Sequence, residues 1–262
     1  MGDGIGRLRS DLVLGFMLLT RLPMPSLAHY DKDALARSIW TYPIVGTVVG
    51  AGSAGALAGA LALGLPPVAA ATIALAVLVL FTGCFHEDGL ADFWDGIGGG
   101  RTVERKLEIM RDSRIGSYGA TALILMFVCR IALIAGLAER YGPVQAATAI
   151  VAAGLLGRSA IAGVLLLIGP ARSDGLTATA HNPPLWSGVA ALTLALLAFV
   201  LLTPAAAIAS IVATAGVVLV MAALMQRQIQ GFVGDGLGAT EVKVELAVLV
   251  AVTGVLSAWP PG

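Results

Sequence analysis

The residues with the clearest chemical potential form one acidic segment, His86-Glu87-Asp88-Gly89-Leu90-Ala91-Asp92-Phe93-Trp94-Asp95-Gly96. Asp88, Asp92 and Asp95 stand at positions i, i+4 and i+7, so on a helix they lie within about 60° of one another. Three like charges on one helical face repel, and Mg²⁺, which prefers carboxylate oxygens and accepts substrate phosphates, relieves that repulsion. The spacing therefore predicts a Mg²⁺ site for chemistry at a phosphate group. The alternative is a solvated acidic face paired with nearby bases, namely Arg101, Arg105 and Arg111.

A glycine-rich stretch, Gly96-Ile97-Gly98-Gly99-Gly100, follows the acids. Consecutive glycines tolerate positive φ and close approach of the backbone to a ligand, so we expect this stretch to break the acidic helix. Gly98 and Gly99 are then candidates for backbone contact with a substrate phosphate. A flexible turn explains the same pattern.

Residues 101–114 have the pattern of an amphipathic helix, with Leu107 and Met110 inward and Lys106 outward. Asp112, near its end, is a candidate fourth metal ligand. Arg114 is a candidate for bidentate contact with phosphate, because a guanidinium presents paired donors.

Three further residues are expected at the same site. His86 lies on the side of the helix opposite the aspartates, where it contacts substrate, acts as a general base or is only an interfacial ring. Arg172 and Asp235 each stand beside glycines, in the segments 171–176 and 234–239. Each pattern fits a plain loop, but together the two loops are expected to form further walls of one site.

The composition indicates the elements that must position these residues. Hydrophobic residues make up 58% of the 262 positions and charged residues only 12%, about half the charged fraction usual in soluble domains. The mean hydropathy of +0.90 agrees. Gly and Ala are abundant, and small residues let helices approach closely in lipid. The sequence therefore predicts a single all-α membrane domain over residues 1–262, with the polar motif loop at 86–118.

Seven stretches approach the roughly 20 apolar residues that cross a bilayer. They are approximately residues 39–63, 67–85, 120–138, 144–168, 185–202, 205–225 and 244–260. Residues 5–22 are expected to form an additional interfacial or re-entrant helix. The first span carries Gly46-x₃-Gly50 and Gly55-x₃-Gly59, a spacing that suits close helix contacts.

Alternation of these spans places the long polar segments on one side. That side holds thirteen of the 16 Lys and Arg residues, and the opposite side holds only Arg140. By the positive-inside rule, the motif side faces the cytosol across the cytoplasmic (inner) membrane. Arg130 and Arg158 remain within spans, where an ionised group is costly in lipid. Each is expected to form an interhelical pair or to bind an anion at the floor of a cavity.

Several segments of the chain match one known family. They are Leu19–Pro23, Asp88–Asp92 with Asp95-Gly96, Leu107–Gly116, Tyr118-Gly119, Ala171-Arg172 with Asp174-Gly175, and Gly234-Asp235 with Leu237-Gly238-Ala239. With these segments the sequence resembles the cobalamin synthase family, the adenosylcobinamide-GDP ribazoletransferases of bacterial and archaeal membranes. The resemblance runs from about residue 19 to 240, nearly the whole chain.

The resemblance implies the last joining step of cobalamin assembly. Adenosylcobinamide-GDP and α-ribazole or its 5′-phosphate are the implied substrates, Mg²⁺ the cofactor, and GMP the leaving product. For that chemistry we assign Asp88, Asp92 and Asp95 as metal ligands, with Asp112 a fourth, and Asp92 or Asp95 as the alternative proton acceptor. Phosphate contacts are expected from two arginines, Arg114 and Arg172, and positioning from Asp235.

Two other classes stay open at this stage. A CDP-alcohol phosphotransferase also clusters aspartates on membrane helices, but its pattern has Ala-Arg after the first Asp-Gly, and here Ala91 is followed by Asp92. A cation-coupled transporter places acids near the bilayer midplane, whereas these acids gather at one surface. The net charge of zero gives no case for nucleic-acid binding. Membrane lipid is an expected partner, and a homo-oligomer stays open.

Overall fold

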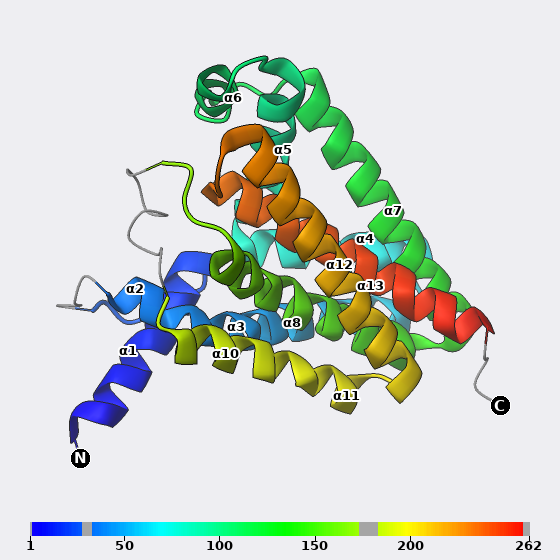
Figure 1. Cartoon of the computed structure of the whole chain (residues 1–262). Coiled ribbons are helices and arrows are strands. Elements are labelled where there is room, and N and C mark those ends of the chain that lie inside the picture. Colours follow the sequence, from blue (N-terminus) through cyan, green and yellow to red (C-terminus); the bar gives the residue numbers. More distant parts are fainter. Residues whose placement is uncertain (1, 28–32, 173–182, 259–262) are drawn as a thin grey trace.

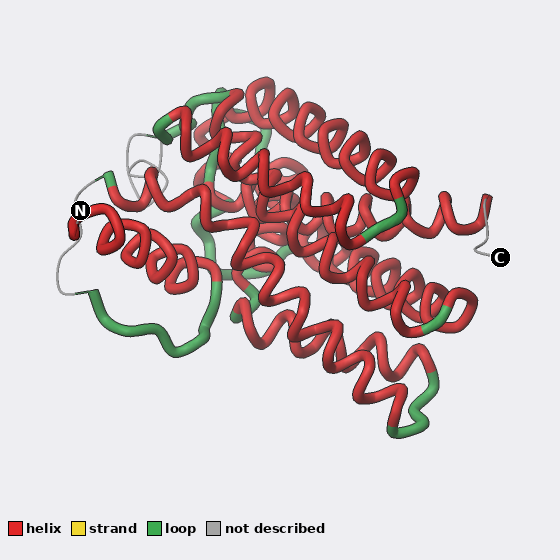
Figure 2. The backbone as a smooth tube through the Cα atoms, turned by 90° about the horizontal axis from the view of Figure 1, so that it is seen from below, coloured by secondary structure: helices red, strands yellow, loops and turns green. Residues whose placement is uncertain are grey.

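The computed structural model is a bundle of helices, described here for residues 2–27, 33–172 and 183–258 (Figure 1; Figure 2). Within these residues no strand forms, and the one β-bridge joins Pro170 to Phe232. The all-α class expected from composition is confirmed.

The helices follow one another with short connections. Their bounds are α1 Gly2–Leu19, α2 Ala34–Arg37, η1 Ser38–Thr41, α3 Tyr42–Ala62, α4 Pro67–Thr82, α5 Phe85–Gly99, α6 Val103–Ile109, α7 Ser117–Tyr141, α8 Pro143–Leu167, α10 Leu185–Leu194, η2 Ala195–Leu197, α11 Ala198–Leu201, α12 Pro204–Ile229 and α13 Gly234–Ala258. Proline occupies the first turn of several helices, including α4, α8 and α12, where its missing N–H costs no intrahelical bond.

Four helical stretches in the described chain are long and apolar enough to cross a membrane: 34–62, α7, α8 and α12. The pair α4 and α5 passes the same test together but bends by 88° between its two helices. The count of about seven spans stays a prediction, for two physical reasons. The α10–α11 segment has fewer than 18 residues, and α13 carries Glu241, Lys243 and Glu245 within its apolar sequence.

Helix α3 packs against α8 through small residues. A side chain on Gly46 would collide with the backbone of Gly154, and one on Gly50 would lie 3.0 Å from the Cα of Val151. The close contact expected from the first glycine pair is confirmed. A side chain added at Gly55 or Gly59, the second pair, would meet no atom of the described residues within 4 Å, so no close helix contact forms there.

The centre of the bundle contains buried ion pairs. Arg130 on α7 pairs with Glu245 on α13 and lies 3.5 Å from a Glu87 carboxylate oxygen on α5. Arg158 on α8 pairs with Glu245 and, at 2.5 Å, with Glu241. Both guanidiniums are almost completely buried, so the expected interhelical pairing is what the structure shows. We call these five residues the ion network.

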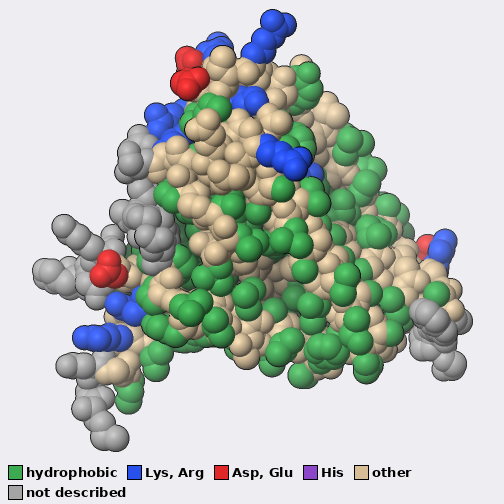
Figure 3. All heavy atoms as spheres, in the orientation of Figure 1, with side chains coloured by type: hydrophobic (Ala, Val, Ile, Leu, Met, Phe, Trp, Pro, Cys, Tyr) green, Lys and Arg blue, Asp and Glu red, His purple; other side chains and the backbone are tan. Residues whose placement is uncertain are grey.

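Charged side chains gather at the ends of the molecule. In Figure 3 they are prominent at the top, where Figure 1 places α6, while hydrophobic side chains cover much of the lower bundle. Helix α1 projects from the bundle at the lower left of Figure 1, and its Asp11 accepts hydrogen bonds from Arg37 and Trp40. An N-terminal helix is therefore present.

Candidate functional site

The acidic segment forms α5, which begins after a sharp turn of the chain. Gly83 and Cys84 both have positive φ, 65° and 61°, and this pair of left-handed residues turns α5 by 88° from α4. Gly83 is required at this turn for a second reason, since a side chain there would collide with Arg21. The turn places the aspartates of α5 beside the start of α13.

Asp88 and Asp92 face Asp235, which lies in the first turn of α13. The charges of Asp88 and Asp235 both act on the carboxylate of Asp92, so these acids are close in space. The helices meet at Gly89, where an added side chain would lie 3.1 Å from the Cα and carbonyl oxygen of Asp235. In the described chain, no hydrogen bond or ion pair engages the carboxylates of Asp88 and Asp92. Three acids from two helices thus converge, including the pair expected from spacing.

Asp95 has a different position from the other two members of the expected stripe. It is buried, and its carboxylate accepts hydrogen bonds from the backbone N–H groups of Gly116, at 2.6 Å, and Gly119, at 2.8 Å. Side chains at either glycine would collide with this carboxylate. Asp95 therefore binds the exposed N–H groups at the start of α7, where an anion is stabilised. A metal-ligand or proton-acceptor role for Asp95 stays a prediction.

Asp112 and Arg114 pair with each other in the loop before α7. The Arg114 guanidinium donates to both carboxylate oxygens of Asp112, with the shortest contact at 2.6 Å. These hydrogen bonds hold the pKa of Asp112 down at about 2. The side chain of Arg114 is 85% exposed. Roles for Asp112 on the metal and for Arg114 on phosphate therefore stay predictions, and neither side chain lines the cavity described next.

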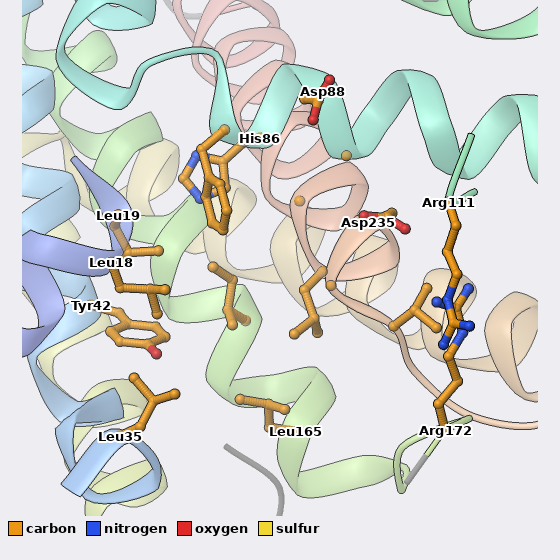
Figure 4. Close-up of a pocket in the computed structure, with 17 residues that line it drawn as sticks. Leu18, Leu19, Leu35, Tyr42, His86, Asp88, Arg111, Leu165, Arg172 and Asp235 are labelled. Atoms are coloured by element: carbon orange, nitrogen blue, oxygen red, sulfur yellow. The ribbon is translucent and has the colours of Figure 1, made fainter. Parts of the chain in front are cut away.

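A cavity of about 670 Å³ lies beneath the acids, at the junction of α1, α2, α3, α5, α8 and α13. Asp88 and Asp235 lie on its rim, and Arg111 and Arg172 close one end, with their guanidiniums pointing toward each other (Figure 4). Arg172 also donates to the carbonyl oxygen of Leu107, at 2.7 Å, which holds it against α6. Both guanidiniums bring positive charge to this end of the cavity.

The opposite side of the cavity is apolar. We call it the apolar wall and define it by six side chains: Leu18, Leu19, Leu35, Tyr42, Ile161 and Leu165. His86 lies between the wall and the acids (Figure 4). The cavity is therefore divided into a charged part and an apolar part.

His86 connects the cavity to the ion network. Its side chain is 2% exposed, its Nδ1 lies 3.7 Å from a carboxylate oxygen of Glu241, and it packs edge-on against Phe85. It also belongs to the cavity lining, and its role as a substrate contact stays a prediction. Arg158, in contrast, forms ion pairs with Glu241 and Glu245 and does not line the cavity. Its anion-binding role stays a prediction.

The glycine-rich stretch ends the acidic helix, as expected. Helix α5 continues through Gly99, and Gly100, the last glycine of the stretch, is its C-cap with extended backbone. Gly98 packs against the ring of Tyr118, and Gly99 approaches the side chain of Ile109. These contacts explain the need for small residues, and the C-terminal end of a helix carries partial negative charge. Phosphate contact by Gly98 and Gly99 stays a prediction.

Helix α6 also differs from its sequence pattern. Met110 is buried, but so is Lys106, whose ammonium donates to Gln228 on α12 at 2.5 Å. The expectation that Lys106 faces outward is therefore wrong. The amide oxygen of Gln228 accepts a hydrogen bond from the buried ammonium, which stabilises it between α6 and α12.

The sequence did not predict two features of the site: the position of Arg111 and the glutamates of the ion network. The sequence pattern indicates Arg111 only as a partner of the acidic face, although it stands in the same motif as Arg114 and lines the cavity. The ion-network glutamates were also missed. Glu241 and Glu245 stand four residues apart at the start of an apolar stretch, and that spacing was a signal for partners of the arginines within spans.

In the residues that the structure describes, no three His, Cys, Asp or Glu side chains are grouped closely enough to hold a metal ion. The acids that do converge, on α5 and α13, carry hard oxygen donors. Residues 173–182, which include the expected Asp174-Gly175 pair, lie outside the described residues.

The fold and the site define a class: a helical membrane-type protein with a cavity that arginines and clustered carboxylates line. The chain belongs to the cobalamin-5-phosphate synthase family, whose model matches residues 11–253. It is similar to the adenosylcobinamide-GDP ribazoletransferase of Bradyrhizobium diazoefficiens, with 43% identity over 248 residues and 92% of each chain covered. The protein of the same name from Azorhizobium caulinodans is 42% identical over 256 residues, which cover 94% of this chain and 96% of the relative. No solved structure matches the chain.

Proposed function

We propose that this chain is an adenosylcobinamide-GDP ribazoletransferase that depends on Mg²⁺. It transfers the adenosylcobinamide phosphate group to α-ribazole or α-ribazole 5′-phosphate, and it releases GMP. The product is adenosylcobalamin or its 5′-phosphate. Membership of the family and the shared name of its relatives support the reaction.

The observation that carries the proposal is the order of groups along the cavity. Carboxylates on α5 and α13 lie between a pair of arginines and the apolar wall (Figure 4). Transfer at a phosphate depends mainly on positioning and on stabilisation of charge. Arg111 and Arg172 bind the oxygens of the pyrophosphate from one side, and their fixed direction orients the reacting phosphorus toward the acids.

The donor set supports Mg²⁺ as the cofactor. Mg²⁺ is usually held by one or two carboxylates, while waters and substrate phosphates complete its coordination. Asp88, with Asp235 opposite, fits a metal ion that binds together with the nucleotide, while Asp92 beside them takes its alternative role as proton acceptor, and such a site needs no preformed group of three ligands. When bound, the ion supplies neutralisation of charge on the phosphate oxygens.

The reaction requires one proton acceptor. A ribose hydroxyl of the acceptor forms a new O–P bond, the bond from the same phosphorus to the GMP oxygen breaks, and the hydroxyl proton leaves. We assign that proton to Asp92, because its half-buried carboxylate has no hydrogen-bond partner in the described chain, whereas both oxygens of Asp95 are engaged by α7.

We assign the protein to the cytoplasmic membrane, with the acids on the cytosolic side. The apolar helices and the excess of Lys and Arg beside the motif support this placement. A single membrane domain and contact with lipid follow from the same composition.

The test is GMP release by purified protein in liposomes that contain adenosylcobinamide-GDP, α-ribazole 5′-phosphate and Mg²⁺. GMP and a cobalamin product are expected in equal amounts, and both are expected to disappear with a chelator and to return with added Mg²⁺. Absence of turnover from well-folded protein would overturn the proposal and favour another phosphotransferase or a transporter. Turnover that survives the chelator would remove Mg²⁺ from it.

A further inference from the structure

We infer that the apolar wall is the binding site for the heteroaromatic base of the acceptor nucleoside, an inference that rests on the proposed transfer reaction. The wall combines side chains from α1, α2, α3 and α8, so elements distant in sequence build one surface. Tyr42 and Leu19 are buried in the protein while they line this space.

The order of groups along the cavity assigns the wall to the acceptor. In a phosphoryl transfer the attacking and leaving oxygens lie roughly in line, on opposite sides of the phosphorus. The arginines, at one end, suit the phosphate of the leaving GMP. With the acids between, the attacking hydroxyl must approach from the other side, where the apolar wall lies (Figure 4).

The chemistry of the wall fits the base of the acceptor better than it fits the guanine or the corrinoid of the other substrate. Five of its six residues are aliphatic, and the hydroxyl of Tyr42 is its only polar side-chain group. Guanine carries several donors and acceptors along its edge, which such a wall leaves unsatisfied at a cost. A benzimidazole ring is flat and largely apolar. A cavity of about 670 Å³ takes a ligand of nucleotide size but not a whole corrinoid with its attached nucleotide.

The experiment measures kcat and KM for each substrate separately in wild type and in Leu165→Ala. Loss of contact with the base is expected to lower kcat/KM for α-ribazole 5′-phosphate by about 10-fold or more, while KM for adenosylcobinamide-GDP changes by less than about 2-fold. The preference for dimethylbenzimidazole over unsubstituted benzimidazole in the acceptor is expected to shrink as well. Leu18→Ala, on a different helix, gives a second variant should Leu165→Ala fold poorly.

Leu167→Ala is the matched control, because Leu167 lies on the same helix, is 53% exposed and is absent from the cavity lining. Calorimetric binding of free 5,6-dimethylbenzimidazole supplies a readout that needs no turnover. Binding that Leu165→Ala weakens, and Leu167→Ala does not, is the expected result. A change confined to KM for adenosylcobinamide-GDP would overturn the inference, as would unaltered binding of the base in both wall variants. Wild-type protein that binds the base but releases no GMP would overturn the proposed reaction instead.

Discussion

At the scale of single residues, the acids of the motif divide into two groups. Asp95 and Asp112 are engaged, by the start of α7 and by Arg114 respectively. Asp88 and Asp92 keep carboxylates without hydrogen bonds or ion pairs in the described chain, next to Asp235. Like charges held together without partners destabilise a fold, and the proposed Mg²⁺ offsets that repulsion when it binds.

Asp92→Asn is expected to lower the rate of GMP release by about 100-fold or more, since the amide neither accepts the proton nor carries the charge. The melting temperature is expected to stay the same or rise, because the change removes repulsion from Asp88 and Asp235. Rate and melting temperature are measured on the same preparation. Glu104→Gln, an exposed change on α6, serves as control, and equal rates for the two variants would remove Asp92 from the chemistry.

Arg172→Ala is expected to raise KM for adenosylcobinamide-GDP by about 10-fold, because one of the two guanidiniums directed into the cavity is lost. The exposed Arg105→Ala change on α6 is the matched control. Arg114→Ala, assayed beside them, tests the role predicted for that residue from its motif. An unchanged KM in Arg172→Ala would place the pyrophosphate elsewhere.

How far the sequence predicts these residues depends on distance along the chain. The spacing of Asp88 and Asp92 is local and was sufficient, because helix geometry alone places them on one face. The hydrogen bonds of Asp95 to the start of α7 were not predictable, since they depend on two N–H groups more than twenty residues later in the chain. Arg111 and Arg114 could not be ranked either, because the fold of the loop between α6 and α7 decides which of them reaches the cavity.

At the scale of elements, the site depends on the contact between α5 and α13. Gly89→Val is expected to reduce activity by about 10-fold or more, because the new side chain would push against the backbone of Asp235 and separate the acids. GMP release and melting temperature report the effect. Gly136→Ala and Gly216→Ala, at helical positions with open space around them, are controls that should keep activity. Full activity in Gly89→Val would show that the chemistry does not need this contact.

The ion network joins the same two helices to α7 and α8. Glu245→Leu is expected to destabilise the protein by about 3–5 kcal/mol, because it leaves Arg130 and Arg158 buried without their shared carboxylate. Glu108→Gln, which breaks the exposed pair with Arg105, is expected to cost less than about 1 kcal/mol. Unfolding in detergent measures both. Similar values for the two would contradict a stabilising role for the network.

At the scale of the whole molecule, composition predicted a helical membrane protein because lipid leaves few other choices for a chain with so little charge. Composition could not predict the path of segments whose length or charge is close to the limit for a membrane span. The apolar run at 67–85 ends in a turn of 88°, which the left-handed pair Gly83 and Cys84 produces. Near the start of α13, Glu241 and Glu245 are neutralised by arginines from other helices, and their spacing signals buried partners without identifying which arginines they are.

The orientation of the molecule can be tested on α7, which has motif residues at one end and Arg140 at the other. Its 25 residues span about 37 Å, more than the thickness of a bilayer core, so the helix is long enough to place its ends on opposite sides. In a background without Cys84 and Cys129, Ser113→Cys is expected to react with an impermeant maleimide only in inside-out vesicles. Arg140→Cys is expected to react only in right-side-out vesicles. Both positions are exposed, so poor access does not explain a missing signal. The reverse pattern would place the acids outside the cytosol, away from any cytosolic supply of nucleotide, and labelling of both positions from one side would mean that α7 does not cross the membrane.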